Sequence, residues 1–217
     1  MHDIFSNKKA IIFDMDGVII DNISYHIEAL KIFLKQFGKE VTEEEFQNHY
    51  NGRTIQEVIL DLKPGADPKE VMRLAEEKEK IYRDLYSQDL APTPGLMEFL
   101  PKAKKAGLKM AVATSAITAN ADFTLDGLNI REYFDAVIDS TMVIKGKPDP
   151  QIYIKAAEQL NISPENCVVM EDALAGIQSA KSAGMDVIGL YTSLKKEELP
   201  NGLLMKIKDF NELNKNE

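Results

Sequence analysis

The stretch KAIIFDMDGVI, residues 9–19, decides how the rest of the chain is interpreted. Its apolar run, residues 10–13, ends at two aspartates separated by one residue, Asp14 and Asp16. Four apolar residues between a lysine pair and an Asp-Gly turn predict a strand buried on both faces. Ligands of open α/β sheets bind just beyond the carboxyl ends of the strands, so both aspartates are expected at the mouth of a site. Taken alone, an Asp-x-Asp-Gly is more often a polar strand end that runs into a turn.

The net charge and cysteine content of the chain predict which partners it binds and in which cellular compartment it works. The chain has 217 residues, 44% of them hydrophobic, and a formal charge of −9. This negative charge argues against binding to nucleic acid or to an anionic membrane, because both need clustered Lys and Arg. The single cysteine, Cys167, cannot form an intramolecular disulfide, and residues 1–5 do not resemble a targeting segment. We therefore expect a cytoplasmic monomer that binds neither nucleic acid nor a membrane.

Residues 23–88 carry helical patterns throughout. Apolar residues at helical spacing predict a helix from Ile23 to Phe37. Pro68 suits the first position of a later helix, which is expected to continue to about Tyr86. Three capping boxes, in which a Glu follows a capping residue by three positions, predict further helix starts: Thr42 with Glu45, Thr54 with Glu57, and Asp67 with Glu70.

From Pro92 onward, strand and helix patterns alternate. The alternation predicts βαβ units and a parallel sheet covered by helices on both sides. The fold class is therefore α/β: a Rossmann-like three-layer core, residues 1–20 and 92–217, with an inserted all-α helical cap, residues 21–91. The two connections are hinge candidates through which the cap could close over a site, the alternative being a rigidly docked subdomain. The predicted strands after the first lie at residues 108–114, 136–139, 167–170 and 187–190.

Polar residues follow the other predicted strands at the same edge of the sheet. They form three groups: Thr114 with Ser115, Lys147, and Glu171 with Asp172. The two acids of the last group, together with Asp14 and Asp16, would gather four negative charges, which favours a divalent cation. Mg²⁺ prefers oxygen ligands and contacts substrate phosphate. A carboxylate nucleophile surrounded by Mg²⁺, a lysine and hydroxyl groups is typical of phosphoryl transfer, although each residue alone is more often an ordinary loop or strand-end residue.

These motifs resemble those of the haloacid dehalogenase superfamily, and within it the β-phosphoglucomutase-like group with a helical cap. The resemblance covers essentially the whole chain. It implies phosphate chemistry, because the family's dehalogenases lack an acid at the position of Asp16. The motifs match in order: Asp14-Met15-Asp16-Gly17-Val18, Thr114-Ser115, Lys147-Pro148, and Glu171-Asp172 with Gly176 following.

The resemblance implies a two-step reaction. Asp14 would attack the phosphoryl group and form an aspartyl-phosphate, while Asp16 would protonate the leaving oxygen and then activate water or a hydroxyl. Mg²⁺ would be bound by Asp14, the backbone carbonyl of Asp16 and Asp172, and Glu171 would hold a metal-bound water. The phosphoryl oxygens would be bound by a further set: Thr114, Ser115 and Lys147.

Two cap residues have both a structural and a functional interpretation. Lys78 falls at the centre of the apolar stripe of its helix, so it either extends to solvent or directs its ammonium at an anionic ligand. His26 falls on the apolar side of the first cap helix, where a hydrogen-bonded core histidine is usual. Both positions resemble the histidine and lysine that β-phosphoglucomutases place over the active site.

One departure from that group concerns substrate choice. The mutases carry an arginine three residues after a cap glycine, where it binds the second phosphate. Here Arg53 follows Gly52 directly and Ile55 stands three residues on, which disfavours a mutase, although Arg53 could still face the site. The sequence therefore predicts a Mg²⁺-dependent phosphatase of a small phosphorylated metabolite, with a sugar phosphate as the expected substrate. The alternatives are β-phosphoglucomutase, action on pyrophosphate or nucleotide monophosphates, and a non-enzymatic phospho-acceptor module.

Overall fold

The computed structural model describes residues 3–50 and 53–215. The chain divides into two compact units, one joining Met1–Asp21 to Leu90–Glu217 and the other consisting of Asn22–Asp89. The first unit contains a sheet with helices, and the described part of the second contains helices and turns alone. The chain therefore leaves the α/β unit after its first strand and returns to it before the second.

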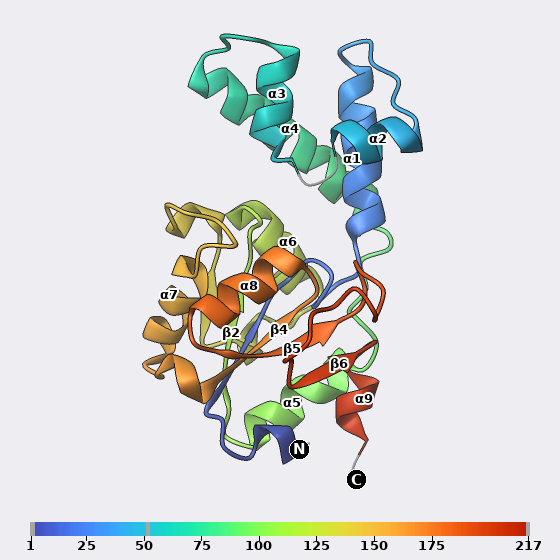
Figure 1. The fold of residues 1–217 in the computed structure, drawn as a ribbon. Helices are drawn as coiled ribbons and strands as arrows, with labels where there is room; N and C mark the ends of the chain where they lie inside the picture. The colour runs from blue at the N-terminus through green and yellow to red at the C-terminus, as the bar shows by residue number, and fades with distance from the viewer. Residues whose placement is uncertain (1–2, 51–52, 216–217) are drawn as a thin grey trace. The chain divides into compact units, whose positions relative to one another are not determined.

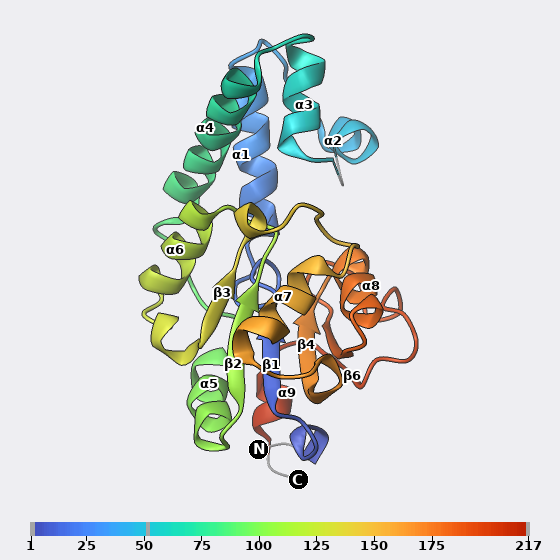
Figure 2. The ribbon, with the colours of Figure 1, turned by 90° about the vertical axis from the view of Figure 1, so that its left-hand side faces the viewer.

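A parallel sheet organises the α/β unit. Within the described residues it has six strands in the order β3-β2-β1-β4-β5-β6, and each neighbouring pair is parallel (Figure 2). The central strand β1 lies between β2 and β4, so Phe13 faces Val112 on one neighbour and Met170 on the other. The strands are β1 Ala10–Phe13, β2 Lys109–Ala113, β3 Ala136–Ile138, β4 Cys167–Glu171, β5 Asp186–Leu190 and β6 Met205–Ile207.

Helices cover both faces of this sheet, because alternate side chains of each buried strand point to opposite faces. On one face, Ile12 of β1 belongs to one buried cluster with apolar residues of α7 and α8 (Figure 2). On the other face, the ring of Phe13 lies 6.3 Å from that of Phe99 in α5 and 6.1 Å from that of Phe210. The helices of this unit are α5 Leu96–Lys105, α6 Thr118–Gly127, α7 Gln151–Leu160, α8 Leu174–Ser182 and α9 Asn211–Asn214, with short 3₁₀ turns at Asp3–Phe5, Arg131–Tyr133, Ser140–Met142 and Pro164–Asn166.

These layers confirm the predicted α/β fold with a parallel sheet. The sheet nevertheless continues beyond the last predicted strand, which ended at Leu190, because β6 was not predicted. Lys206 interrupts the apolar residues of that strand, whereas the equally short β3 is a continuous apolar run that the sequence reveals. Cys167 is buried in β4, and burial raises its pKa to about 11.

The second unit is a group of packed helices (Figure 1). Helices α1 and α3 both pack against α4, and Phe33, Ile59 and Leu74 are among the buried side chains of their common core. Ile55 is partly buried against the same core. The helices are α1 Ile23–Lys35, α2 Glu43–His49, α3 Ile55–Leu62 and α4 Pro68–Tyr86. No helix among residues 3–50 and 53–215 is both long and apolar enough to cross a membrane.

The helix starts of this unit test the capping predictions. The boxes at Thr42 and Thr54 are confirmed, because each side chain accepts from the backbone of a Glu three residues later and the Glu bonds back. The helix start at Asp67 is confirmed, because Asp67 is the N-cap and Pro68 the first helical residue, but its capping box is wrong. Asp67 accepts instead from the backbone N–H of Lys69 at 2.8 Å, and Glu70 pairs with Lys63. The first helix also ends earlier than predicted, at Lys35, before Gly38 adopts a left-handed conformation with φ +71°.

Candidate active site

The carboxyl ends of the three central strands bring the predicted site residues together. Asp14 follows β1, Thr114 follows β2, and Glu171 is the last residue of β4. The backbone N–H of Asp14 donates to the carbonyl of Met170 at 3.0 Å, which continues the pairing of β1 with β4 beyond the end of β1. These residues therefore lie at one edge of the sheet.

Three carboxylates meet at this edge. Asp14, Glu171 and Asp172 each offer an oxygen, and these oxygens all lie within 4.8 Å of one another. The three residues are buried, at 8%, 1% and 2% exposure respectively. Asp16 is partly exposed, and its charge contributes to the electrostatic field on Asp14 and Asp172. The α/β unit therefore holds a buried concentration of negative charge.

Lys147 is the positive charge within this cluster. Its Nζ lies 2.7 Å from Asp14 Oδ1 and 2.7 Å from Glu171 Oε1, and its side chain is 7% exposed. The same ammonium lies 4.9 Å from the centre of the Tyr153 ring. One ammonium thus faces three buried carboxylates.

Glu171 has its acceptor positions filled by the protein itself. Its Oε1 accepts from Lys147 and, at 3.0 Å, from the hydroxyl of Tyr153. Its Oε2 accepts from the backbone N–H groups of Asp172 and Ala173, each at 2.8 Å. A carboxylate oxygen has two lone pairs, so both oxygens are already saturated. Glu171 is therefore better suited to orient its neighbours than to bind an ion directly.

Gly176 makes room for this arrangement. A Cβ atom added there would lie 1.6 Å from Glu171 Oε1, which no real contact permits. The first turn of α8 consequently packs directly against the carboxylate of Glu171.

The pKa directions follow from burial and crowding. Burial raises the pKa of Asp14 well above its ordinary value; Lys147 opposes this, and Glu171 and Asp172 add to it. Burial, followed by the charge of Glu171, raises the pKa of Asp172 to about 7. For Lys147, burial alone would lower the pKa, but the Asp14 and Glu171 carboxylates outweigh it and raise the value well above normal. Both aspartates thus lack enough positive charge around them.

A hard divalent cation would supply that missing charge. Asp14 and Asp172 present carboxylate oxygens, the ligand type that Mg²⁺ prefers. Lys147 pairs with Asp14 and Glu171, so one ammonium stands against three clustered carboxylates. The donor set therefore fits a magnesium ion.

The two hydroxyl residues after β2 differ in placement. Thr114 is fully buried, and its Oγ1 accepts from the backbone N–H of Ala116 at 3.0 Å. Ser115 is exposed. Thr114 is thus held in one orientation by its own turn.

The predicted residues of the helical unit fall into two separate groups. Lys78 Nζ lies 3.0 Å from His26 Nδ1 and 3.0 Å from Glu79 Oε1, and the ring of His26 stacks on Tyr82 at 3.8 Å. The Lys78 side chain is 8% exposed, so it does not extend into solvent. Arg53 makes an ion pair with Asp61 at 2.7 Å. Gly52, which we also expected in the site, lies outside the described residues.

Three residues that contact the acidic cluster were missed. Tyr153 lies on the apolar face of α7 and was hidden within an ordinary helical pattern. Thr192 and Ser193 follow β5, and both contact Asp172 Oδ2. The rule that sites gather at the carboxyl ends of strands could have identified these two residues, because β5 was predicted.

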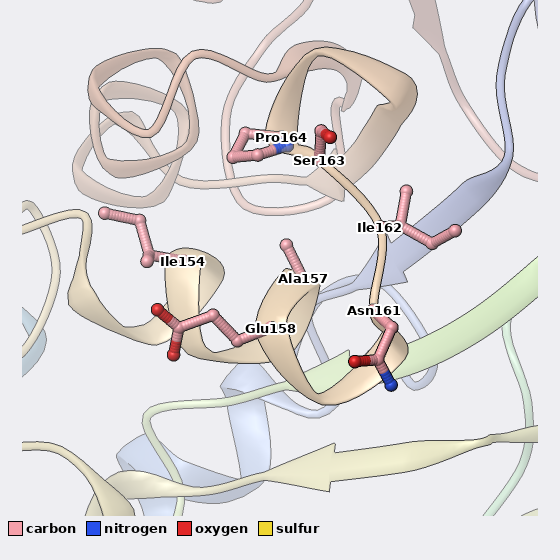
Figure 3. Close-up of a pocket in the computed structure, with 7 residues that line it drawn as sticks. All are labelled: Ile154, Ala157, Glu158, Asn161, Ile162, Ser163 and Pro164. Carbon is pink, nitrogen blue, oxygen red and sulfur yellow. The ribbon is translucent and has the colours of Figure 1, made fainter.

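A surface pocket of about 480 Å³ lies elsewhere in the α/β unit (Figure 3). Its residues precede the amino end of β4, whereas Glu171 marks the carboxyl end, and a five-residue strand spans roughly 16 Å. Glu158 is the one charged side chain in the lining, so the pocket lacks the groups of the acidic cluster. The lining residues are Ile154, Ala157, Glu158, Asn161, Ile162, Ser163 and Pro164.

The chain matches known proteins over most of its length. Residues 11–190 match the family described as haloacid dehalogenase-like hydrolase. The chain is 34% identical over 192 residues to a phosphorylated carbohydrates phosphatase of Thermotoga maritima, covering 86% of this chain and 87% of that one. It is 36% identical over 193 residues to a beta-phosphoglucomutase of Bacillus subtilis, covering 84% and 83%. The crystal structure of a HAD hydrolase, family IA, variant 3, from Entamoeba histolytica superposes with a TM-score of 0.87 at 31% identity, covering 94% of each chain.

These matches extend over the α/β core and over the helices between β1 and β2. They confirm the resemblance inferred from the four motifs and the expectation of a phosphatase enzyme. The chain belongs to the haloacid dehalogenase-like hydrolase family.

Proposed function

We propose that this chain is a Mg²⁺-dependent phosphatase of a small phosphorylated carbohydrate and that Asp14 is its nucleophile. The observation that carries the proposal is the buried Asp14 carboxylate, bonded to Lys147 at 2.7 Å and crowded by Glu171 and Asp172. Relatives named as a phosphorylated carbohydrates phosphatase and a beta-phosphoglucomutase support the substrate class.

Three residues would hold the magnesium ion: Asp14 and Asp172 through their carboxylates, and Asp16 through its backbone carbonyl. Glu171 would not bind the ion itself, because its oxygens already accept four hydrogen bonds; it would orient Lys147 and the backbone of Asp172. When bound, the ion neutralises charge on these carboxylates and on the substrate phosphate.

In the first step, a carboxylate oxygen of Asp14 attacks phosphorus. The new bond joins that oxygen to phosphorus while the bond from phosphorus to the sugar oxygen breaks. Asp16 gives its proton to the departing sugar oxygen, which leaves as an alcohol. The partial exposure of Asp16 suits this role, because a proton donor must reach the substrate.

In the second step, water attacks the phosphorus of the aspartyl-phosphate. Asp16, now ionised, takes a proton from that water, and the bond from phosphorus to Asp14 breaks. Inorganic phosphate is released and both aspartates return to their starting states.

Lys147 and the residues after β2 would bind the phosphoryl oxygens. An ammonium has three N–H donors, and Asp14 and Glu171 take two of those of Lys147. The third would turn from the adjacent Tyr153 to a phosphoryl oxygen. Thr114 uses a lone pair to accept from Ala116, and no acceptor for its hydroxyl proton occurs within the described part of the chain. Ser115 would donate from its exposed position beside it.

The helical unit is proposed to act as a cap whose polar residues recognise the carbohydrate. Lys78 and His26 would bind its hydroxyl groups. The charge of Lys78 is balanced by Glu79 and that of Arg53 by Asp61. A second phosphate would need an uncompensated cation, so these pairs favour a monophosphate.

The decisive experiment measures phosphate release from a panel of phosphorylated carbohydrates, with nucleotide monophosphates and pyrophosphate as comparison substrates. Each is assayed with Mg²⁺ and with EDTA. We expect Mg²⁺-dependent release that is at least tenfold faster, by kcat/KM, from one carbohydrate monophosphate than from the comparison substrates. Equal release in EDTA would contradict the metal, and preference for pyrophosphate would contradict the substrate class.

A mutase is the second candidate, because the Bacillus subtilis relative is named as one. A coupled assay for glucose 6-phosphate formed from β-glucose 1-phosphate separates the two. We expect phosphate release to exceed isomer formation, because the ion pairs of Arg53 and Lys78 leave neither charge free for a bisphosphate.

A further inference from the structure

The loop that follows β5 contributes two hydroxyl groups to the acidic cluster. Ser193 Oγ donates a hydrogen bond to Asp172 Oδ2. Thr192 Oγ1 donates to the backbone carbonyl of Gly17 at 2.6 Å and lies 3.5 Å from the same Oδ2. Neither residue belongs to the four motifs, and both lie at the carboxyl end of a strand.

These hydroxyls make the two oxygens of Asp172 unequal. Across residues 3–50 and 53–215, each hydrogen bond that its side chain makes ends on Oδ2. Oδ1 accepts none of them. Because an oxygen that already accepts hydrogen bonds is a poorer ligand than a free one, Oδ1 is the oxygen left for a cation.

The loop after β1 is held by the same pair of residues. Gly17 has φ +80°, and a Cβ there would lie 2.0 Å from Asp172 Oδ2, so the backbone passes directly against this oxygen. The bond from Thr192 to the Gly17 carbonyl fixes that backbone one residue after Asp16. The loop after β5 therefore ties together the segments that carry Asp16 and Asp172.

We infer that Ser193 and Thr192 are positioning residues for the magnesium site. Ser193 would hold the Asp172 carboxylate through Oδ2 and leave Oδ1 for the cation, and Thr192 would fix the backbone after Asp16. This inference rests on the proposed magnesium site and adds residues that orient its ligands. Such outer contacts commonly change metal affinity by about 10- to 100-fold when they are removed.

The test measures Mg²⁺ binding by calorimetric titration of the full chain without substrate, so that it does not depend on turnover. Ser193→Ala removes the hydroxyl, and Ser193→Thr keeps it. Tyr191→Phe is the matched control, because it removes a hydroxyl of the same loop that bonds Glu212 at 3.4 Å. Ser193 is exposed, so its replacement by alanine leaves no buried cavity.

We expect Ser193→Ala to raise the Kd for Mg²⁺ about tenfold. Ser193→Thr and Tyr191→Phe should each stay within about twofold of the unmodified chain, as judged against the same range of effects. Thr192→Val, which releases the Gly17 carbonyl, should also weaken Mg²⁺ binding.

Two results would overturn the inference, and they can be told apart. If the unmodified chain binds Mg²⁺ and Ser193→Ala binds it equally well, the positioning role is wrong and the proposed function stands. If the unmodified chain binds no Mg²⁺ and releases phosphate equally in EDTA, the metal site itself is wrong and the inference fails with it.

Discussion

Lys147 in the α/β unit and Lys78 in the helical unit both have buried side chains, and the surroundings of these two lysines differ. Lys147 in the α/β unit contacts two carboxylates at 2.7 Å, and a third acid completes the cluster. Lys78 in the helical unit contacts one carboxylate, Glu79, and the ring of His26. The first arrangement has an excess of negative charge, whereas the second pairs one ammonium with one carboxylate.

The different surroundings of the two lysines fit the proposed division between phosphoryl transfer and substrate recognition. Burying unpaired charge is costly, so crowded buried carboxylates either take up protons or pair with a cation. An ammonium that is paired with one carboxylate, as in Lys78 with Glu79, has little net charge and therefore suits an uncharged polar part of a ligand. We therefore expect phosphoryl transfer in the α/β unit and substrate choice in the helical unit, and the following substitutions test that division.

Asp14→Asn should have the largest effect, because an amide cannot attack phosphorus. We expect kcat to fall by at least about 10⁴-fold, the scale seen when a nucleophile is removed. The free energy of unfolding without Mg²⁺ should not fall, because burial already disfavours the charged form of Asp14. Assays of phosphate release and thermal unfolding check both points, with Asp61→Asn as the control for a surface ion pair. Turnover within tenfold of the unmodified enzyme would remove Asp14 from its role.

Lys147→Met should rank second. It removes the one ammonium among three buried carboxylates, and we expect kcat to fall about 10²- to 10³-fold. Without Mg²⁺ the unfolding free energy should fall by about 3 kcal/mol, the usual cost of breaking a buried ion pair. Denaturant titrations with and without Mg²⁺ measure this. If stability and kcat both survive, the cluster does not depend on its lysine.

Gly176→Ala should have a moderate effect through Glu171. The new methyl group would overlap Glu171 Oε1, so the carboxylate must move and its four hydrogen bonds must change. Overpacking of this kind costs about 2 kcal/mol in unfolding free energy. Gly146→Ala is the stability control, because a Cβ there meets no atom within 4 Å. Equal unfolding curves for the two variants would show that Glu171 is not confined.

Lys78→Met should act on substrate binding and little on chemistry. We expect KM for the preferred substrate to rise about tenfold while kcat changes less than about threefold, as for a contact made equally in the ground and transition states. Steady-state kinetics with that substrate measure both constants. A large fall in kcat with unchanged KM would place Lys78 in the chemical step and would remove the contrast between the two lysines.

Glu79→Gln should have the smallest effect on activity. It tests whether the pairing of Lys78 with a carboxylate sets substrate choice. It leaves the ammonium of Lys78 without its carboxylate at 3.0 Å. We expect substrates with a second anionic group to gain about a few-fold in kcat/KM relative to monophosphates, because the Lys78 ammonium can then pair with that group. Competition between a bisphosphate and a monophosphate measures the ratio. An unchanged ratio would mean that Glu79 does not tune substrate choice.

Much of the α/β unit could be predicted because its signals are local. Short apolar runs ending in polar residues marked β1, β2 and β4, and the carboxyl ends of parallel strands share an edge. The structure accordingly brings Asp14, Lys147 and Glu171 together. The capping box at Asp67 failed because Lys63, outside the motif, competes for Glu70.

The sequence by itself determined the order of elements, the parallel sheet and the edge at which the acids gather, because periodicity and strand ends are written locally in the chain. Only the tertiary structure decided which residues hold those acids in place. Tyr153 reaches Glu171, Ser193 reaches Asp172 and Thr192 reaches Gly17 across intervals of 18, 21 and 175 residues. Such contacts leave no periodic signal, because they depend on how separate loops meet at one edge of the sheet.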